Sequence, residues 1–160
     1  MARILHTADW HLGARLVNHE RGEEHARFLE WMLDQMRRLK PDLLIIAGDI
    51  FDSANPTQVA LTQYYRFLAG VAHGTESQVL VVGGNHDSAL TLNAPRDLLR
   101  SLRIRVVGCA PELVTDAVFE LGNTVVCAGP YLRERDVRRG APGQTFEEVA
   151  AQIRDGIAGY

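Results

Sequence analysis

The chain has 160 residues, of which 46% are hydrophobic and 23% are charged. These fractions are ordinary for a globular domain, and they exclude a disordered tail, a collagen-like repeat and a coiled coil. The longest apolar run is the five residues from Leu43 to Ala47, whereas a membrane-spanning helix needs about 20. We therefore expect one compact domain over residues 1–160, with no segment in a membrane.

The net charge is −3, from 17 basic and 20 acidic residues. This value argues against a protein whose whole surface binds nucleic acid through positive charge, but it leaves room for a local basic groove. No long apolar segment follows Met1, so no secretory signal is evident and we expect a cytoplasmic protein. Cys109 and Cys127 each lie in an apolar stretch, and we expect both thiols to be reduced and buried.

The first helix is predicted over residues 22–39, after a short strand over residues 3–8. An apolar stripe recurs at helical spacing in this segment, which indicates that the helix covers a sheet. Lys40-Pro41 ends it, because proline cannot continue the helical hydrogen bonds. The predicted stripe consists of Phe28, Trp31, Met32, Gln35, Met36 and Leu39.

Two further buried strands are predicted over residues 42–47 and 78–82. The helix between them begins at Asn55-Pro56-Thr57, a typical helix start, and runs to about Val71. Continuous apolar strands separated by helices favour parallel strands joined by right-handed crossovers. The fold class is therefore α/β.

The pattern loosens after Ser88. We expect a short helix over residues 94–102, and then strands near residues 105–107, 112–120 and 123–128 with antiparallel or mixed pairing. The last segment is predicted to be a helix with an N-terminal capping box formed by Thr145 and Glu148. Its apolar stripe comprises Phe146, Val149, Ala150, Ile153 and Ile157.

Ligand-type side chains follow each of the three predicted strands. Because the carboxyl ends of parallel strands meet at one edge of a sheet, we expect the loops that carry them to converge. Carboxylate, imidazole and amide ligands together suit Mn²⁺, Fe or Zn²⁺. In an extended strand end, two residues at a spacing of two point to the same face, as two ligands of one cation need. The residues in chain order are Asp9 and His11, then Asp49 and Asp52, then Asn85, His86 and Asp87.

Asp49 lies on the middle loop, where its two oxygens can bridge two cations. Two ions about 3.5 to 4 Å apart would clamp a phosphate and lower the pKa of a bound water, which points to phosphoester hydrolysis. His86 is then suited to the substrate, either stabilising charge or protonating the leaving oxygen. It needs an orienting carboxylate, for which Asp52 is the first candidate and Asp87 the second.

The remaining histidines and arginines have simpler interpretations. His6 is expected to be a hydrogen-bonded structural histidine, and His19 and His25 to be solvated. His73 suits the negative end of the second helix. A basic cluster formed by Arg133, Arg135, Arg138 and Arg139 alternates with acidic residues and is expected to be a solvated loop.

The motif series D-x-H, then GD, then GNHD resembles the opening motifs of the calcineurin-like metallophosphoesterases. The resemblance implies mixed β-sheets flanked by helices and two divalent metal ions, with Mn²⁺ favoured. It also implies that Asp9, His11 and Asp49 ligate one ion, that Asp49 and Asn85 ligate the other, and that His86 acts in catalysis.

Protein phosphatases of this family carry GDxVDRG and GNHE, whereas this chain has Ser53-Ala54 and Asp87 at the differing positions. The difference favours the nuclease branch of the family. The expected activity is then exonucleolytic or endonucleolytic cleavage of DNA in recombination, replication and repair. The implied partners are DNA and an ATPase subunit, with a homodimer as a further expectation.

The family pattern continues with a GH motif and then GHxH, whose histidines complete both metal shells. Neither motif occurs in this sequence, in which the last histidine is His86. We therefore expect the chain to be the N-terminal part of a longer protein, truncated before the C-terminal half of the fold and inactive on its own. Two alternatives stay open: a phosphoesterase acting on small molecules or phosphoproteins, and a scaffold without catalysis.

Overall fold

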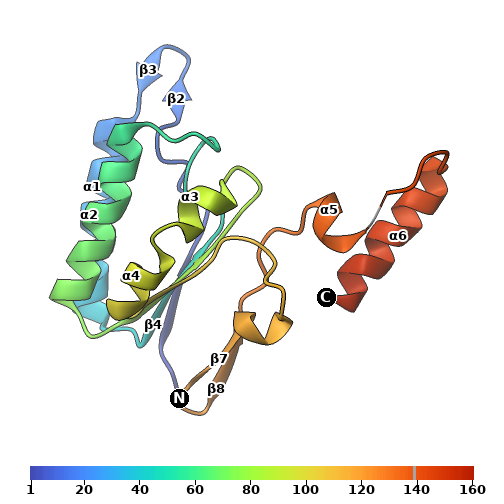
Figure 1. The fold of residues 1–160 in the computed structure, drawn as a ribbon. Helices are drawn as coiled ribbons and strands as arrows, with labels where there is room; N and C mark the ends of the chain where they lie inside the picture. Colours follow the sequence, from blue (N-terminus) through green and yellow to red (C-terminus); the bar gives the residue numbers. More distant parts are fainter. Residues whose placement is uncertain (139) are drawn as a thin grey trace.

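The structure is a computed structural model that describes residues 1–138 and 140–160, so Arg139 of the predicted basic cluster lies outside the described residues. Helices cover one face of a parallel sheet, a β-hairpin covers part of the other, and the two C-terminal helices lie to one side (Figure 1). Among the described residues, no helix combines the length and the apolar composition that crossing a membrane requires.

The sheet contains β1 (Ile4–Thr7), β4 (Leu43–Ala47), β5 (Gln78–Val82) and β6 (Ile104–Val107), all parallel and in the order β1-β4-β5-β6. The predicted parallel α/β arrangement is therefore confirmed. The prediction of a buried first strand is wrong, because β1 is an edge strand with Ile4 and His6 exposed. His6 is accordingly a surface residue, and its ring makes no hydrogen bond to the described residues.

Helix α1 (Gly22–Leu39) has the predicted bounds and ends at Lys40 in the left-handed conformation, just before Pro41. The predicted stripe is only partly right. Trp31 is 54% exposed, because the stripe that packs inward is rotated around the helix. The buried face consists of His25, Leu29, Met32 and Met36, so the prediction that His25 is solvated is also wrong.

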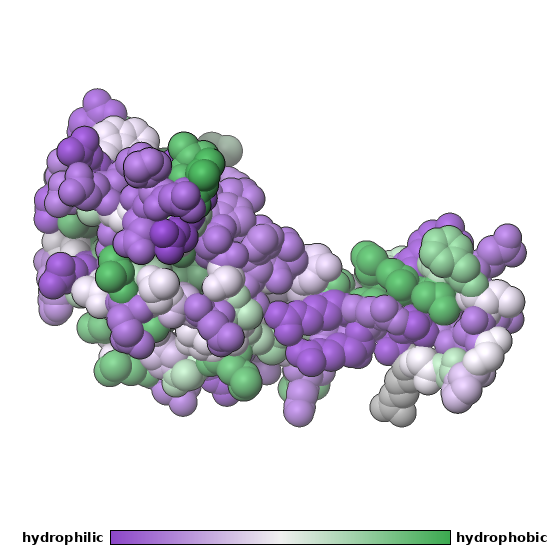
Figure 2. Space-filling model, turned by 90° about the horizontal axis from the view of Figure 1, so that it is seen from above, coloured by the Kyte–Doolittle hydropathy of each residue, from purple (hydrophilic) through white to green (hydrophobic). Residues whose placement is uncertain are grey.

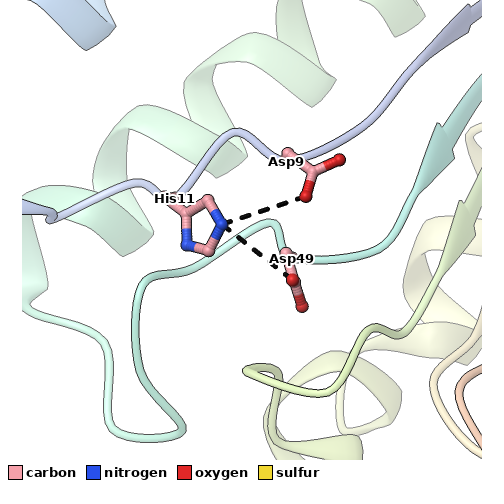
Figure 3. Close-up of side chains that lie close together, drawn as sticks. All are labelled: Asp9, His11 and Asp49. Atoms are coloured by element: carbon pink, nitrogen blue, oxygen red, sulfur yellow. Dashed lines mark ion pairs between the residues drawn. The ribbon is translucent and has the colours of Figure 1, made fainter.

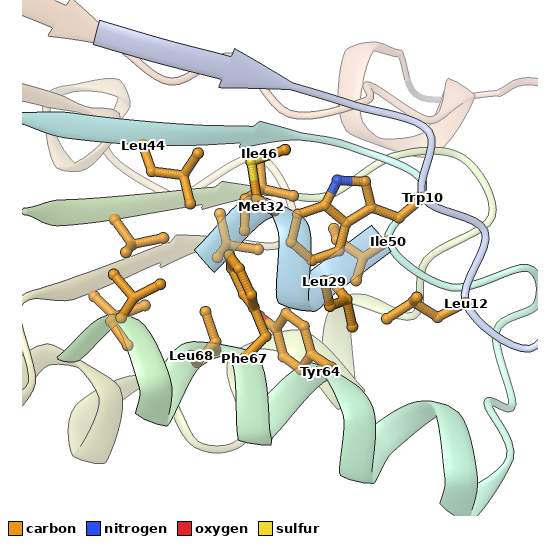
Figure 4. Packing of buried hydrophobic residues seen from close by; sticks show 14 of the residues in the cluster. Trp10, Leu12, Leu29, Met32, Leu44, Ile46, Ile50, Tyr64, Phe67 and Leu68 are labelled. Carbon is orange, nitrogen blue, oxygen red and sulfur yellow. The ribbon is translucent and has the colours of Figure 1, made fainter. Parts of the chain in front are cut away.

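Helix α2 (Gln58–Gly74) packs beside α1. The hydroxyl of Thr57 caps it by accepting a hydrogen bond from the Ala60 N–H at 3.2 Å, so Pro56 precedes the cap and lies outside the first turn. Between these helices and the sheet lies the main core, in which Trp10 meets Phe67 edge-on with ring centroids 5.2 Å apart (Figure 4). A two-stranded hairpin of β2 (Arg15–Leu16) and β3 (His19–Glu20) precedes α1, and His19 is exposed on it as predicted.

The helix predicted over residues 94–102 is present as α4 (Arg96–Ser101), and a short helix that was not predicted, α3 (Ala89–Asn93), precedes it. Pro95 lies between them and cannot continue α3. The strand predicted over residues 112–120 begins later than expected, since a 3₁₀ helix, η1 (Val114–Ala117), precedes β7 (Val118–Leu121).

Strands β7 and β8 (Thr124–Cys127) form an antiparallel hairpin, which confirms the predicted change of pairing for these two strands. That prediction is wrong for β6, which continues the parallel sheet beside β5. Phe119 and Val126 of the hairpin pack on the second face of the sheet. Cys127 points outward from β8 and is exposed, while Cys109 is half-buried. The prediction that both thiols are buried is therefore wrong, although both are free. The reason is the alternation of β8, which buries Val126 and turns its neighbours outward.

Helices α5 (Glu134–Val137) and α6 (Phe146–Gly159) pack against each other beside the main body. The predicted capping box is present: the Glu148 N–H donates to the Thr145 hydroxyl at 3.3 Å, and the Thr145 N–H donates to the Glu148 carboxylate at 2.8 Å. The predicted apolar stripe of α6 faces outward, with Phe146 86% exposed. Hydrophobic side chains gather at this end of the molecule in Figure 2.

Candidate metal centre

Three loops meet at the carboxyl edge of the sheet: the first loop (residues 8–14), the second loop (48–57) and the third loop (83–88). The first two run side by side, because Asp9 N–H donates to the Gly48 carbonyl at 3.1 Å and His11 N–H donates to the Asp49 carbonyl at 2.9 Å. The pairing continues as a parallel bridge between Leu12 and Phe51. Main-chain hydrogen bonds thus hold Asp9, His11 and Asp49 in register beyond the end of the sheet.

The third loop is joined to the second by the carboxylate of Asp87, which is 1% exposed. One of its oxygens accepts hydrogen bonds from the N–H groups of Ile50 at 3.3 Å and Gly84 at 2.9 Å, and the other accepts from Phe51 at 3.1 Å. Asp87 is therefore occupied with main-chain amides, and the structure does not place it as the orienting partner of the His86 ring.

The second and third loops approach each other so closely that Gly84 has no space for a side chain. A Cβ atom at this position would collide with the main-chain nitrogen and the carboxylate of Asp49. Asp49 also accepts a hydrogen bond from the His86 N–H at 3.0 Å. The third loop is therefore in direct contact with Asp49 on both sides of Asn85.

Asp9, His11 and Asp49 bring three ligand atoms within 4.8 Å of one another. The His11 Nε2 atom lies 4.0 Å from a carboxylate oxygen of Asp9 and 3.9 Å from one of Asp49 (Figure 3). These separations are too long for hydrogen bonds. They suit donors around a shared ion, since two ligand atoms each about 2.1 Å from one metal lie roughly 3 to 4 Å apart. The donor set and its spacing therefore fit a divalent cation.

All three residues have left-handed backbone conformations, with φ of 56° at Asp9, 45° at His11 and 48° at Asp49. Each such non-glycine residue costs about 1 to 3 kcal/mol, and this strain is typical of functional sites. The expected extended strand end is therefore wrong, because β1 ends at Thr7. The first loop instead turns around Trp10, whose indole packs into the core and leaves Asp9 and His11 on the outside.

His86 lies beside this group, with its ring 5.0 Å from that of His11 in an edge-on arrangement. Its Nδ1 atom is 2.9 Å from the main-chain oxygen of Asp52. Because a carbonyl oxygen only accepts, Nδ1 must carry the proton, and Nε2 is left free. Asp52 does contact His86, but through its carbonyl, whereas its carboxylate lies 3.4 Å from His11 Nδ1.

The surroundings of His86 raise the pKa of its ring. The largest cause is the hydrogen bond to the Asp52 carbonyl; partial desolvation opposes it, and the negative charges of Asp49, Asp52 and Asp87 add to it. Bound cations would act against the carboxylate charges, so the hydrogen bond is the contribution that persists in a loaded site.

Asn85 is exposed at the tip of the third loop, between two residues that contact Asp49. Its side chain makes no hydrogen bond to the described residues, so its amide oxygen is available to bind a metal ion. The four residues expected to bind metal therefore come from three loops that the structure holds together by main-chain contacts.

One contact to this site was not expected from the sequence. The Arg133 guanidinium donates to the main-chain oxygen of Asp87 at 2.9 Å. The expectation of a solvated basic loop is therefore wrong for Arg133, and also for Arg138, whose side chain is 13% exposed and pairs with Glu134. It describes Arg135, whose side chain is 73% exposed. No sequence signal predicts this contact, because the hydrogen bond from the Arg133 N–H to the Asp136 carboxylate fixes the main chain of Arg133 but not the direction of its side chain.

His25 is the other residue near the site whose environment differs from expectation. It is 6% exposed, and its Nδ1 has no hydrogen-bond partner among the described residues. Burial lowers the pKa of His25, and the charge of Arg21 lowers it further against the opposing effect of Glu24 and Asp52. The folded protein therefore holds this ring neutral over a wider range of pH than the unfolded chain does.

The lowered pKa of His25 predicts a pH dependence of stability. As pH falls below about 6.5, the unfolded chain binds the proton first, so the free energy of unfolding should decrease by up to about 1.4 kcal/mol per pH unit. Replacing His25 with glutamine should remove this contribution, and His19→Gln, at an exposed position, should not. Urea unfolding between pH 5 and 8, roughly the histidine range, measures it. Equal pH slopes for wild type and His25→Gln would contradict the prediction.

The parallel sheet, the strained loops and the clustered carboxylates and imidazole fit the type of site that a metal-dependent phosphoesterase needs. The family model of the calcineurin-like phosphoesterases matches residues 2–145, and the chain belongs to this family. The family resemblance expected from the motifs is thereby confirmed.

Among curated proteins, the chain is similar to the SbcD component of nuclease SbcCD from several bacteria. It is 37% identical over 161 residues to that of Escherichia coli K12, covering 99% of this chain and 40% of the relative. It is 42% identical over 168 residues to that of Rhodobacter capsulatus, covering 95% and 41%. The SbcD component of Bacillus subtilis is 35% identical over 106 residues, covering 66% and 27%. The chain thus spans about 40% of the length of the first two relatives.

Proposed function

We propose that this chain belongs to the nuclease component of an SbcCD-like complex, a DNA phosphodiesterase that uses two divalent ions, Mn²⁺ being favoured. The observation that carries the hydrolytic part is the convergence of Asp9, His11 and Asp49, with ligand atoms within 4.8 Å of one another. Similarity to the SbcD component of nuclease SbcCD supports DNA as the substrate.

In this proposal Asp9, His11 and Asp49 hold one ion, and Asp49 and Asn85 hold the other. When bound, such ions would polarise a phosphoryl oxygen and offset the negative charge that develops during hydrolysis. Asp49 is suited to the shared position because one of its oxygens faces His11 while the other faces the third loop.

His86 is the proposed catalytic proton donor. Its Nδ1–H is fixed on the Asp52 carbonyl, so Nε2 is the atom that can give a proton to the leaving oxygen. The raised pKa of His86 increases the fraction of the ring that carries this proton. Asp52 thus has two positioning roles, because its carbonyl holds His86 and its carboxylate faces His11.

The proposed partners are DNA and an SbcC-like ATPase, with a homodimer as a further element of the proposal. The proposed processes are DNA recombination, replication and repair, and residues 1–160 are proposed to form one part of a nuclease domain. The proposed location is the cytoplasm, where the free thiols Cys109 and Cys127 suit a reducing environment.

The proposal is tested with the complete product of the gene and two substrates, linear duplex DNA and a small phosphodiester such as bis(p-nitrophenyl) phosphate. We expect Mn²⁺-dependent degradation of the duplex, loss of activity with EDTA and recovery on adding excess Mn²⁺, because the carboxylates of the site need a cation to bring a phosphate close. Hydrolysis of the small substrate alone would overturn the nuclease proposal. Metal binding without turnover of either substrate would favour a scaffold.

A further inference from the structure

The chain between β8 and α5 contacts the third loop, and we call residues 131–133 the strap; the course of this segment from β8 to α5 can be followed in Figure 1. Tyr131 N–H donates to the Gly83 carbonyl at 2.9 Å, and the Arg133 guanidinium donates to the Asp87 carbonyl at 2.9 Å. The strap therefore holds the third loop at both ends, and Asn85 and His86 lie between the two attachment points.

The main chain of Arg133 is fixed by two hydrogen bonds to Asp136. Its N–H donates to the Asp136 carboxylate at 2.8 Å, and its carbonyl accepts from the Asp136 N–H at 2.8 Å. The side chain is half-buried. The guanidinium therefore reaches Asp87 from a fixed main-chain position.

The two sides of Asp87 have separate partners. Its carboxylate accepts from the amides of Ile50, Phe51 and Gly84, which ties the third loop to the second. Its carbonyl, in the peptide group between Asp87 and Ser88, accepts only from Arg133 among the described residues. Without Arg133 the carboxylate still anchors the loop, but the peptide group that follows Asp87 can rotate.

We propose that Arg133 is a positioning residue for the metal centre: by fixing the Asp87 carbonyl, it keeps the third loop in the shape that presents Asn85 and His86. The inference rests on the proposed function, since it assigns Asn85 to a metal ion. Groups that hydrogen-bond directly to a metal ligand are worth about 10- to 100-fold in metal affinity, and Arg133 acts one step further out, so we expect an effect near the lower limit.

The direction of the change in Mn²⁺ affinity separates a positioning role of Arg133 from an effect of its charge. Arg133 is a cation close to a cation site, so removing its charge alone should strengthen the binding of Mn²⁺. Loss of positioning should weaken it. Arg135 supplies the matched control, because it carries the same charge two residues further along the chain but is exposed, and its one ion pair among the described residues is with Asp136.

The test compares Arg133→Met, Arg133→Lys and Arg135→Met in the complete gene product. Calorimetric titration with Mn²⁺ should show about 10-fold weaker binding for Arg133→Met. Arg133→Lys should recover most of the affinity, because a lysine ammonium can still donate one hydrogen bond to the carbonyl. Arg135→Met should bind Mn²⁺ as tightly as wild type or more tightly.

Hydrogen exchange of the metal-free proteins gives a second readout. The amides of residues 84–88 should exchange faster in Arg133→Met than in wild type or Arg135→Met. Unchanged Mn²⁺ affinity and exchange in Arg133→Met would overturn the inference, as would an equal loss of affinity in Arg135→Met. Failure of wild type to bind Mn²⁺ would instead overturn the proposed function, while the exchange comparison would still decide whether the strap holds the loop.

Discussion

Replacing His86 with alanine should lower turnover of a phosphodiester by about 10² to 10⁴ while both metal ions remain bound. The reason is that the ring contacts the site through Nδ1 and the Asp52 carbonyl, leaving Nε2 free for the substrate. The ring lies edge-on beside His11, but among the described residues His86 hydrogen-bonds to a proposed ligand through its main-chain N–H to Asp49, and alanine keeps that hydrogen bond. The measurement is single-turnover cleavage at saturating Mn²⁺, with the number of bound ions determined separately.

Asp49→Ala is the matched comparison, because it should lose the ions together with activity. Its two carboxylate oxygens face His11 and the third loop, and alanine removes both of these oxygens from between the two proposed ion positions. Unchanged turnover in His86→Ala would remove His86 from catalysis. Full occupancy by both ions in Asp49→Ala would contradict the bridging role.

The sequence was sufficient to locate the loops that form the site. Continuous apolar runs such as Leu43 to Ala47 identify buried strands, and the ligand-type residues directly after each run had to lie at one edge of a parallel sheet. This argument uses only local pattern and the rule for parallel connections, and it is the part of the prediction that the structure reproduces.

The predictions about the site that were wrong depend on contacts between segments that are distant in the sequence. The left-handed conformations of Asp9 and His11 arise because the first loop pairs with the second and sends Trp10 into the core. Asp52 was expected to hold His86 by its carboxylate, but the bridge between Leu12 and Phe51 turns its carbonyl toward His86 instead. Local spacing contains no information about either contact.

Burial was also mispredicted where the neighbouring element was unknown. Periodicity shows that α1 has an apolar stripe, but packing against α2 decides that Leu29 is buried and Trp31 is not. In the same way, alternation in β8 decides that Val126 is covered and Cys127 is exposed. Hydrophobic pattern predicts that an element has an inner face, and tertiary contacts select the residues on it.

Replacing Asp87 with alanine should lower the free energy of unfolding by about 3 to 4 kcal/mol, because three buried or half-buried amides would lose a charged acceptor. A loss of this size is a large part of the roughly 5 to 15 kcal/mol that stabilises a typical domain. Urea unfolding, followed by the exchange of the amides of Ile50, Phe51 and Gly84, measures it.

Asp87→Asn tests whether stability depends on the hydrogen-bond acceptors of Asp87 or only on the volume of its side chain. Asparagine keeps one oxygen but turns an NH₂ group toward an N–H donor, so it should recover only part of the lost stability. Because Asp87 joins the second loop to the third, Mn²⁺ affinity should fall in the same order as stability, with wild type first, then Asp87→Asn, then Asp87→Ala. If the free energy of unfolding of Asp87→Ala were within about 1 kcal/mol of that of wild type, the three amides would have found other acceptors. Asp87 would then not be the residue that holds the two loops together.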